Sequence, residues 1–185
     1  MPHPDDRVEW ELWTSSADPK SETFKDKFGH VSEALGTHAQ FNPHMMIIDG
    51  RLFGCTQPSK PCGNQCTNSG RYCHEDPEND LQSGVSGVHI VQENLRQMCI
   101  WEQANATKST AKWWTYQNLF SEHCAEYNEQ ATNAPGDPYY KPDNFNKACS
   151  ERQQTAAGLD VAVTVKMVCD ELVTPCLRCR SREHV

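Results

Sequence analysis

The chain has 185 residues, a formal net charge of −8 and 37% hydrophobic residues. Because the negative charge comes without a cluster of Lys or Arg, it would repel phosphate backbones, so we expect no nucleic-acid partner. The longest wholly apolar runs, such as residues 45–48, are far too short for a membrane span. The apolar fraction lies below the roughly 45–50% of an average globular chain, which indicates a lean core that needs cross-links.

The first fifty residues predict a strand, a helix and a second strand. Apolar and polar residues alternate over 8–12, which is typical of a half-buried strand. Asp18 followed by proline is a helix N-cap, and Gly36 is a suitable helix end. Residues 41–48 are nearly all apolar and predict the second strand. This βαβ segment, residues 8–50, implies two parallel strands.

The remaining chain predicts a loop region and then helices. Residues 51–87 are rich in Gly, Pro and Asn and are expected to form a cysteine-rich loop region. Residues 88–179 show helical spacing of apolar residues in several segments. Asp143 and Asp160 are expected to cap the last two of these helices. The remaining segments, 1–7 and 180–185, are expected to be tails.

Ten cysteines lie in the loop region, residues 51–87, and in the helical region, residues 88–179. An even number at irregular spacing is typical of a disulfide framework in an oxidising compartment, and a cytosolic protein with free thiols or zinc sites is the alternative. The pairing stays open. The four from Cys99 to Cys169 lie on apolar helix faces, so we expect them to be buried where helices meet. The full set is Cys55, Cys62, Cys66, Cys73, Cys99, Cys124, Cys149, Cys169, Cys176 and Cys179.

One N-glycosylation sequon, Asn105-Ala106-Thr107, occurs in the chain. It lies in a polar stretch between two helical segments, where a glycan would stay in solvent. No apolar leader segment occurs at the start, although a secreted cysteine framework needs one. The simplest expectation is that the sequence is a fragment, or an incomplete gene model, of a longer secretory protein.

The acidic residues Asp76, Glu78 and Asp80 are a candidate calcium site. Carboxylate oxygens close together on a loop are the ligands that Ca²⁺ prefers. The segment lacks the twelve-residue pattern of a known calcium loop, so a solvated acidic turn is the alternative.

Two pairs of residues are candidates for binding a peptide. Arg71-Tyr72 and Trp113-Trp114 combine the residue types that dominate interface hot spots. The alternatives are a local ion pair for Arg71 and burial in the core for at least one of the tryptophans.

Three motifs resemble the signature of vacuolar sorting receptors. They are C-T-N-S-G-R-Y-C at 66–73, D-P-E-N-D at 76–80 and V-Q-E-N-L-R-Q-M-C at 91–99. Shorter matches to the same family lie between Glu11 and Cys169, and they occur in the same order as in that family. That family consists of single-span receptors that carry soluble cargo from the Golgi to vacuoles in a calcium-dependent way. Their lumenal part contains a thioredoxin-like region with a helical insertion.

The resemblance implies an α+β fold that is mostly helical, with a thioredoxin-like βαβ half and a disulfide-rich helical insertion. Because the chain stops soon after Cys179, we expect the sheet to be incomplete. The implied function is binding of protein or peptide cargo in the lumen of the Golgi or prevacuolar endosome, as part of a membrane receptor. No enzymatic activity is expected, and the only cofactor considered is Ca²⁺.

Two other functions stay open on the sequence. A thioredoxin-type oxidoreductase needs a C-x-x-C at the start of the first helix, but residues 14–20 contain no cysteine. The only C-x-x-C is Cys176-Leu177-Arg178-Cys179, for which local bridging is the better interpretation. A secreted disulfide-rich interaction protein is the third possibility. No spacing around Cys62 to Cys73 matches a known structural zinc site.

Overall fold

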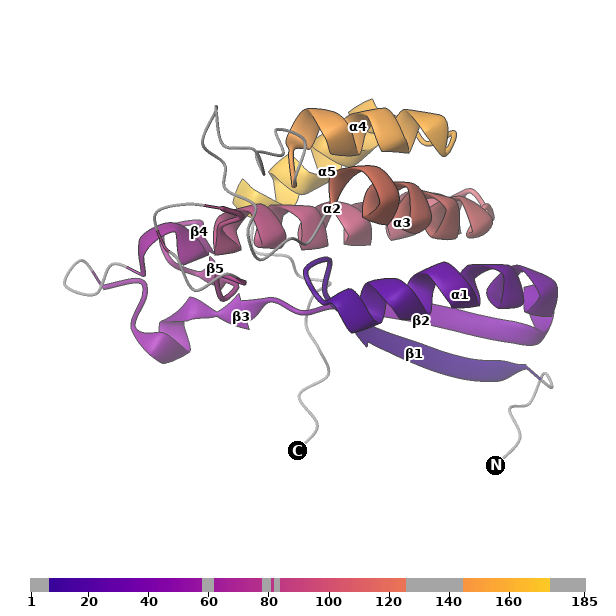
Figure 1. Ribbon diagram of the computed structural model, residues 1–185, viewed down its shortest axis with the longest axis horizontal. Helices are drawn as coiled ribbons and strands as arrows, with labels where there is room; N and C mark the ends of the chain where they lie inside the picture. Colours follow the sequence, from indigo (N-terminus) through magenta and orange to yellow (C-terminus); the bar gives the residue numbers. More distant parts are fainter. Residues whose placement is uncertain (1–6, 58–61, 78–80, 82–83, 126–144, 174–185) are drawn as a thin grey trace.

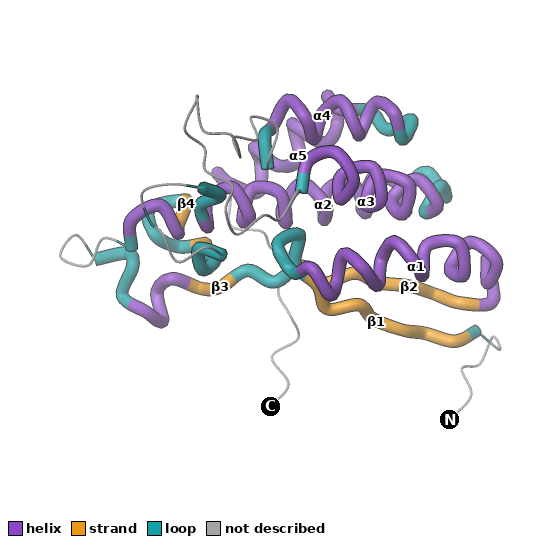
Figure 2. The backbone as a smooth tube through the Cα atoms, in the orientation of Figure 1, coloured by secondary structure: helices purple, strands orange, loops and turns teal. Residues whose placement is uncertain are grey.

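The computed structural model describes residues 7–57, 62–77, 81, 84–125 and 145–173. A two-stranded sheet lies at one side, α1 packs against it, and four further helices stack beyond α1 (Figure 1). Three very short strands form a separate small sheet at one end (Figure 2). The strands are β1 (Val8–Thr14), β2 (Ala39–Met45), β3 (Ile48–Asp49), β4 (Cys66–Thr67) and β5 (Tyr72–Cys73). The α-helices are α1 (Pro19–Leu35), α2 (Gly87–Ala106), α3 (Ala111–Cys124), α4 (Lys147–Ala156) and α5 (Val161–Val173).

The βαβ segment forms as the sequence predicts. β1 and β2 pair in parallel, from Val8 opposite Ala39 to Thr14 opposite Met45. Helix α1 begins at its N-cap Asp18, whose side chain accepts a hydrogen bond from the Lys20 amide. It ends where Gly36, with φ of 50°, adopts a conformation that favours glycine.

The predicted second strand over 41–48 is divided in two. β2 ends at Met45, because β1 ends at Thr14 and offers no further partner. The chain then crosses to the second sheet, where Ile48 of β3 lies opposite Cys73 of β5. β5 also pairs with β4, which makes a three-stranded antiparallel sheet in the order β3-β5-β4.

Aromatic side chains join the sheet to the helices. Phe41 of β2 is 8% exposed, and its ring centroid lies 4.8 Å from that of Trp101 and 5.0 Å from that of Trp114. Trp10 of β1 lies 4.4 Å from Phe41. The βαβ segment and the helices therefore share one core, and β1–β2 does not form a separate one.

Helix α2 is the centre of the molecule. It packs against β2, against the small sheet through β4 and β5, and against helices α3 and α5. The predicted cap of α5 is confirmed, because the Asp160 carboxylate accepts hydrogen bonds from the amides of Ala162 and Val163. The cap of α4 is Asn146; the expected cap, Asp143, lies outside the described residues. None of the described helices combines the length and apolarity that crossing a membrane requires.

Residues 51–87, predicted to be loop-like, contain regular structure. Besides β4 and β5, the chain forms two single-turn 3₁₀ helices, η2 (Gly50–Phe53) and η3 (Gly63–Gln65). Two-residue strands carry no detectable alternation of apolar and polar residues, so pattern analysis could not find them. A disulfide between Cys66 and Cys73 holds β4 and β5 together.

Candidate functional site

Two disulfides hold the region that we call the cysteine-stapled region, residues 48–57 and 62–76. Cys66 and Cys73 lie opposite each other in β4 and β5 and are bonded to each other. Cys55, just after η2, is bonded to Cys62, just before η3. The first bridge fastens the hairpin, and the second brings η2 and η3 together. The framework predicted for these four cysteines is confirmed.

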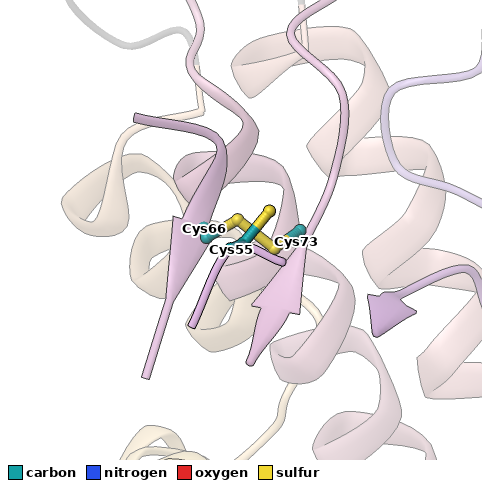
Figure 3. Close-up of side chains that lie close together, drawn as sticks. All are labelled: Cys55, Cys66 and Cys73. Carbon is teal, nitrogen blue, oxygen red and sulfur yellow. A yellow bond between two sulfur atoms is a disulfide. The ribbon is translucent and has the colours of Figure 1, made fainter. Parts of the chain in front are cut away.

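Figure 3 shows the side chain of Cys55 beside the bridge between Cys66 and Cys73. The Sγ atoms of Cys55, Cys66 and Cys73 are all within 4.8 Å of one another. Among the described residues, this is the only group of three or more His, Cys, Asp or Glu side chains close enough to share a metal ion. Cysteine binds zinc as a thiolate, and these sulfurs are engaged in disulfides. The oxidised region is therefore a covalent scaffold.

Two glycines allow the segments of this region to approach closely. A Cβ atom on Gly50 would overlap the Sγ of Cys73 and the carbonyl oxygen of Gly70. A Cβ atom on Gly70, which has φ of 83°, would overlap the carbonyl oxygen of Cys55. The hairpin turn therefore rests directly on the chain at η2, and the amide of Gly50 donates a 2.9 Å hydrogen bond to the carbonyl of Arg71.

Helix η2 presents two apolar side chains to solvent. Leu52 is 81% exposed and Phe53 is 64% exposed. The turn that carries them is fixed, because Asp49 accepts a hydrogen bond from the Arg51 amide and Gly54 ends η2 in a left-handed conformation. The guanidinium of Arg51 also donates to the Asp49 carboxylate, which lowers the pKa of Asp49.

The sequence did not predict that Leu52 and Phe53 are exposed. Two adjacent apolar residues between Gly50 and Gly54, in a segment that shows no helical or strand periodicity, were the available signal. Exposed large apolar side chains on a rigid support are typical of interaction sites.

The candidate pair Arg71-Tyr72 lies in the same region. The guanidinium carbon of Arg71 is 5.3 Å from the centre of the Tyr72 ring, and both side chains are half-buried. Tyr72 belongs to β5, directly opposite Asp49 of β3. The structure therefore brings Arg71 and Tyr72 into the region that carries Leu52 and Phe53.

Trp113 and Trp114 do not lie on the surface. Trp113 is fully buried and Trp114 is 3% exposed. Both belong to the aromatic core around Phe41, and the Trp113 indole donates a 3.0 Å hydrogen bond to the carbonyl of Gln97. The expectation that this pair anchors a ligand is therefore corrected: their apolar area completes the core between the sheet, α2 and α3.

The start of α1 is the place where a thioredoxin-type enzyme would carry its cysteines. Here Ser15 and Ser16 are both buried. The Ser16 amide and hydroxyl donate to Asn94 Oδ1, at 2.9 and 2.6 Å, and the Asn94 amide group donates to the carbonyl of Met46 at 2.8 Å. The hydroxyl of Ser15 is 3.1 Å from His74 Nε2. These contacts join the βαβ segment to α2 and to the cysteine-stapled region.

A shallow depression of about 290 Å³ lies beside the start of α1. It is lined by residues of α1 and of the end of α3, among them Glu22 and Ser121. Burial raises the pKa of Glu22, and the neighbouring Lys25 ammonium opposes that shift. Lys25 is itself 1% exposed, and it pairs with Glu22 and donates to Gln117 Oε1. The wall of this depression therefore contains a carboxylate, Glu22, that is paired with a buried ammonium behind it.

The third signature motif is mostly buried. Glu93 is 1% exposed and is paired with Arg96. It also accepts hydrogen bonds from the hydroxyls of Tyr116, at 2.6 Å, and Ser150, at 3.0 Å. Burial and the negative charge of Glu93 raise the pKa of Tyr116 well above its usual value. This motif thus builds the junction of α2, α3 and α4.

The candidate calcium residues are only partly described. Asp76 is 3% exposed, so it is no solvated residue. Glu78 and Asp80 lie outside the described residues. Binding of a calcium ion by the three carboxylates stays a prediction.

The sequon lies at the end of α2. Asn105 is exposed in the last helical turn, and the Thr107 hydroxyl donates to the carbonyl of Gln103 at 2.9 Å. The polar stretch that we expected between two helices is therefore partly helical. Glycosylation of Asn105 stays a prediction.

The helical cysteines form one described bridge. Cys124, at the end of α3, is bonded to Cys149 in the first turn of α4, and both are 1% exposed. This confirms that a disulfide locks helices to each other. Cys99 is buried on α2. The side chain of Cys169 in α5 and the residues Cys176 and Cys179 lie outside the described part of the chain.

Comparison with known proteins identifies the family. A family model described as the vacuolar sorting receptor thioredoxin-like domain matches residues 8–172. Vacuolar-sorting receptor 1 of Pisum sativum is 36% identical over 173 residues, which are 87% of this chain and 25% of that protein. Vacuolar-sorting receptor 4 of Arabidopsis thaliana is 37% identical over 172 residues, which are 86% of this chain and 24% of that protein.

A more distant relative covers slightly more of the chain. Vacuolar-sorting receptor 6 of Arabidopsis thaliana is 32% identical over 182 residues, which are 92% of this chain and 26% of that protein. The chain spans about a quarter of the length of these curated relatives. The resemblance seen in the three motifs is confirmed: the chain belongs to the vacuolar sorting receptor family, through its thioredoxin-like domain.

Proposed function

We propose that this chain is a lumenal, protein-binding domain of a sorting receptor that directs soluble cargo from the Golgi to the vacuole. Its relatives are named vacuolar-sorting receptors, which supports a receptor-domain role in vacuolar trafficking. The disulfides support an oxidising lumen as its location, in the Golgi or the prevacuolar endosome.

The cargo contacts the cysteine-stapled region. The single observation that carries this assignment is the exposure of Leu52 and Phe53 on a turn that hydrogen bonds and a disulfide hold rigid. A rigid apolar anchor loses little conformational entropy when a partner binds. Arg71 and Tyr72, close by, add side-chain types that are enriched at interface hot spots.

The domain binds and does not catalyse. The relatives are sorting receptors, and the start of α1 carries buried Ser15 and Ser16, which are hydrogen-bonded within the fold. A nucleophilic thiol at that place would need a cysteine. Calcium at Asp76, Glu78 and Asp80 and a glycan at Asn105 complete the proposal.

The test uses a purified soluble vacuolar protein with its sorting propeptide as the probe. We compare its binding to the wild-type chain, to Leu52→Ser with Phe53→Ser, and to the control Val31→Ser with Leu35→Ser. Val31 and Leu35 are also exposed apolar residues, 36% and 39%, but they lie on α1. The probe without its propeptide measures non-specific binding.

We expect the propeptide-dependent affinity to fall about thirtyfold or more in the η2 variant, because losing one hot spot costs about 2 kcal/mol or more. The α1 variant should bind like the wild type. Equal affinity of all three chains would contradict the assignment to the cysteine-stapled region. No propeptide-dependent binding by any of them would contradict cargo binding itself.

A further inference from the structure

The two disulfides of the cysteine-stapled region are close enough to react with each other. The Sγ atoms of Cys55, Cys66 and Cys73 (Figure 3) lie within 4.8 Å of one another, although Cys55 is bonded to Cys62 and not to either of the other two. Disulfides exchange when a thiolate attacks a disulfide sulfur, so three neighbouring sulfurs from two bridges are the arrangement that exchange requires.

No side chain separates the two bridges. A Cβ atom on Gly50 would overlap the Cys73 Sγ and lie 3.1 Å from the Cys55 Cβ. The glycine thus allows the sulfur atoms to approach, and a freed Cys55 side chain needs little movement to reach either sulfur of the hairpin bridge.

The Cys55–Cys62 bridge is the one that an external thiol meets first. Cys55 and Cys62 are both half-buried, whereas in the hairpin bridge Cys66 is half-buried and Cys73 is 5% exposed, so only the Cys55–Cys62 bridge has both of its residues partly open to solvent. In the helical bridge, Cys124 and Cys149 are each 1% exposed. Access to the sulfur is one of the factors that set the rate of exchange.

We propose that Cys55, Cys66 and Cys73 form an internal thiol–disulfide exchange site, which a low-molecular-weight thiol activates. The thiolate of that molecule attacks Cys62 Sγ, forms a mixed disulfide with Cys62, and releases Cys55 as a thiolate. Cys55 then attacks Cys66 Sγ, which forms a Cys55–Cys66 disulfide and releases the Cys73 thiolate.

The second step is equally open to the alternative in which Cys55 attacks Cys73 and releases Cys66. In either case the released thiolate attacks the mixed disulfide on Cys62 and expels the original thiol. One disulfide forms for each that breaks, and the activating thiol is recovered. The net change is a new pairing of the same four cysteines, which refastens the segment that carries η2.

The first experiment uses the variant Cys62→Ser, which leaves an odd number of cysteines in the cluster. Free thiols are alkylated in acid-quenched native protein, the disulfides are reduced and alkylated with a second reagent, and fragment masses locate each label. If three pairings of similar free energy exchange, about two thirds of the unpaired thiol lies on Cys66 and Cys73. A thiol that stays entirely on Cys55 would overturn the proposal. Cys149→Ser is the control, in which the thiol should stay on Cys124.

The second experiment uses the wild-type chain, so that the test does not depend on a variant that folds. A limiting amount of a phosphine reduces one bridge without forming a mixed disulfide, and the same labelling follows. Exchange predicts that a substantial share of the molecules with two labels in the cluster carry one on Cys62 and one on Cys66 or Cys73. Labels confined to Cys55 with Cys62, or to Cys66 with Cys73, would show that the bridges open separately and would overturn the proposal.

Discussion

The cysteine-stapled region and the helical core hold their structures by different means. The helical core combines buried rings, such as Trp113 and Phe120, with a buried charge pair of Glu93 and Arg96. In the cysteine-stapled region, strands of two residues are fastened by bridges over sequence separations of seven residues. That region buries little apolar surface and exposes Leu52 and Phe53.

The comparison explains why the family signature has two kinds of motif. The motif over 66–73 supplies a hairpin bridge and a turn with positive φ at Asn68, Ser69 and Gly70. The motif over 91–99 supplies buried side chains of α2. One motif therefore shapes a surface, and the other supports it from the inside. A surface held by cross-links leaves its apolar side chains free for a partner, which a hydrophobic core cannot do.

The largest effect is expected from breaking the buried charge pair of the helical core. Glu93→Ala leaves Arg96 buried without its carboxylate and removes the acceptor of Tyr116 and Ser150. Removing one partner of such a pair costs about 3–5 kcal/mol of unfolding free energy. Urea unfolding measures the loss. Glu102→Ala, at an exposed position of the same helix, is the control; a similar loss in both variants would contradict the role of Glu93.

Removing the two kinds of bridge should have effects that follow loop length. Cys124 and Cys149 are 25 residues apart, whereas Cys55 and Cys62 are seven apart. In the chain-entropy model, replacing both cysteines of a pair by Ser costs about 3.5 kcal/mol for the first pair and about 2.4 kcal/mol for the second. Thermal unfolding of both double variants measures the difference. A larger loss for the short loop would mean that the cysteine-stapled region carries the stability of the whole fold.

Calcium should stabilise the chain modestly. If Asp76, Glu78 and Asp80 hold an ion, millimolar calcium should raise the unfolding midpoint by about a degree or more, and the shift should grow with concentration. Asp76→Asn with Asp80→Asn should abolish the shift, whereas Glu75→Gln should keep it. If calorimetric titration with calcium shows no heat and the unfolding midpoint does not change, calcium binding by this segment is contradicted.

The smallest effect on stability is expected from Asn105→Gln. The side chain is exposed at the end of α2, so the free energy of unfolding should change by less than about 0.5 kcal/mol. After expression in a eukaryotic secretory system, the wild type should lose mass on treatment with a glycosidase, and the variant should not. Secreted wild-type protein without a removable glycan would contradict the prediction for this sequon.

The sequence predicts the parts of the fold whose signals are local or periodic. Asp18, Gly36 and Asp160 mark helix ends that the structure confirms, because caps depend on residue types at fixed positions. The alternation of apolar and polar residues predicted the position of β1. The helix between the two strands predicted that β2 is parallel to β1. The cap of α4 was missed because a second suitable residue, Asn146, follows Asp143 three positions later.

The candidate site was harder to predict, because it depends on contacts between distant residues. Pairing of Cys55 with Cys62 is one of many possibilities until the chain around Gly50 is placed against the hairpin. Exposure of Leu52 and Phe53 has no periodic signature, and residue type alone favours burial for both. The prediction that Trp113 and Trp114 bind a ligand was wrong for a similar reason. Tryptophan is common at interfaces, but on helix α3 both side chains face the core.

Amide hydrogen exchange tests the separation of the two regions most directly. It compares the wild-type chain with a variant in which Cys55, Cys62, Cys66 and Cys73 are all replaced by Ser. In the wild type, the amides of Gly50 and His74 are hydrogen-bonded to the carbonyls of Arg71 and Gln65. We predict that these amides lose protection in the variant, whereas the amides in the middle of α2 keep it. Equal loss of protection in α2 would contradict the view that the disulfides shape the binding surface and the helical core stands without them.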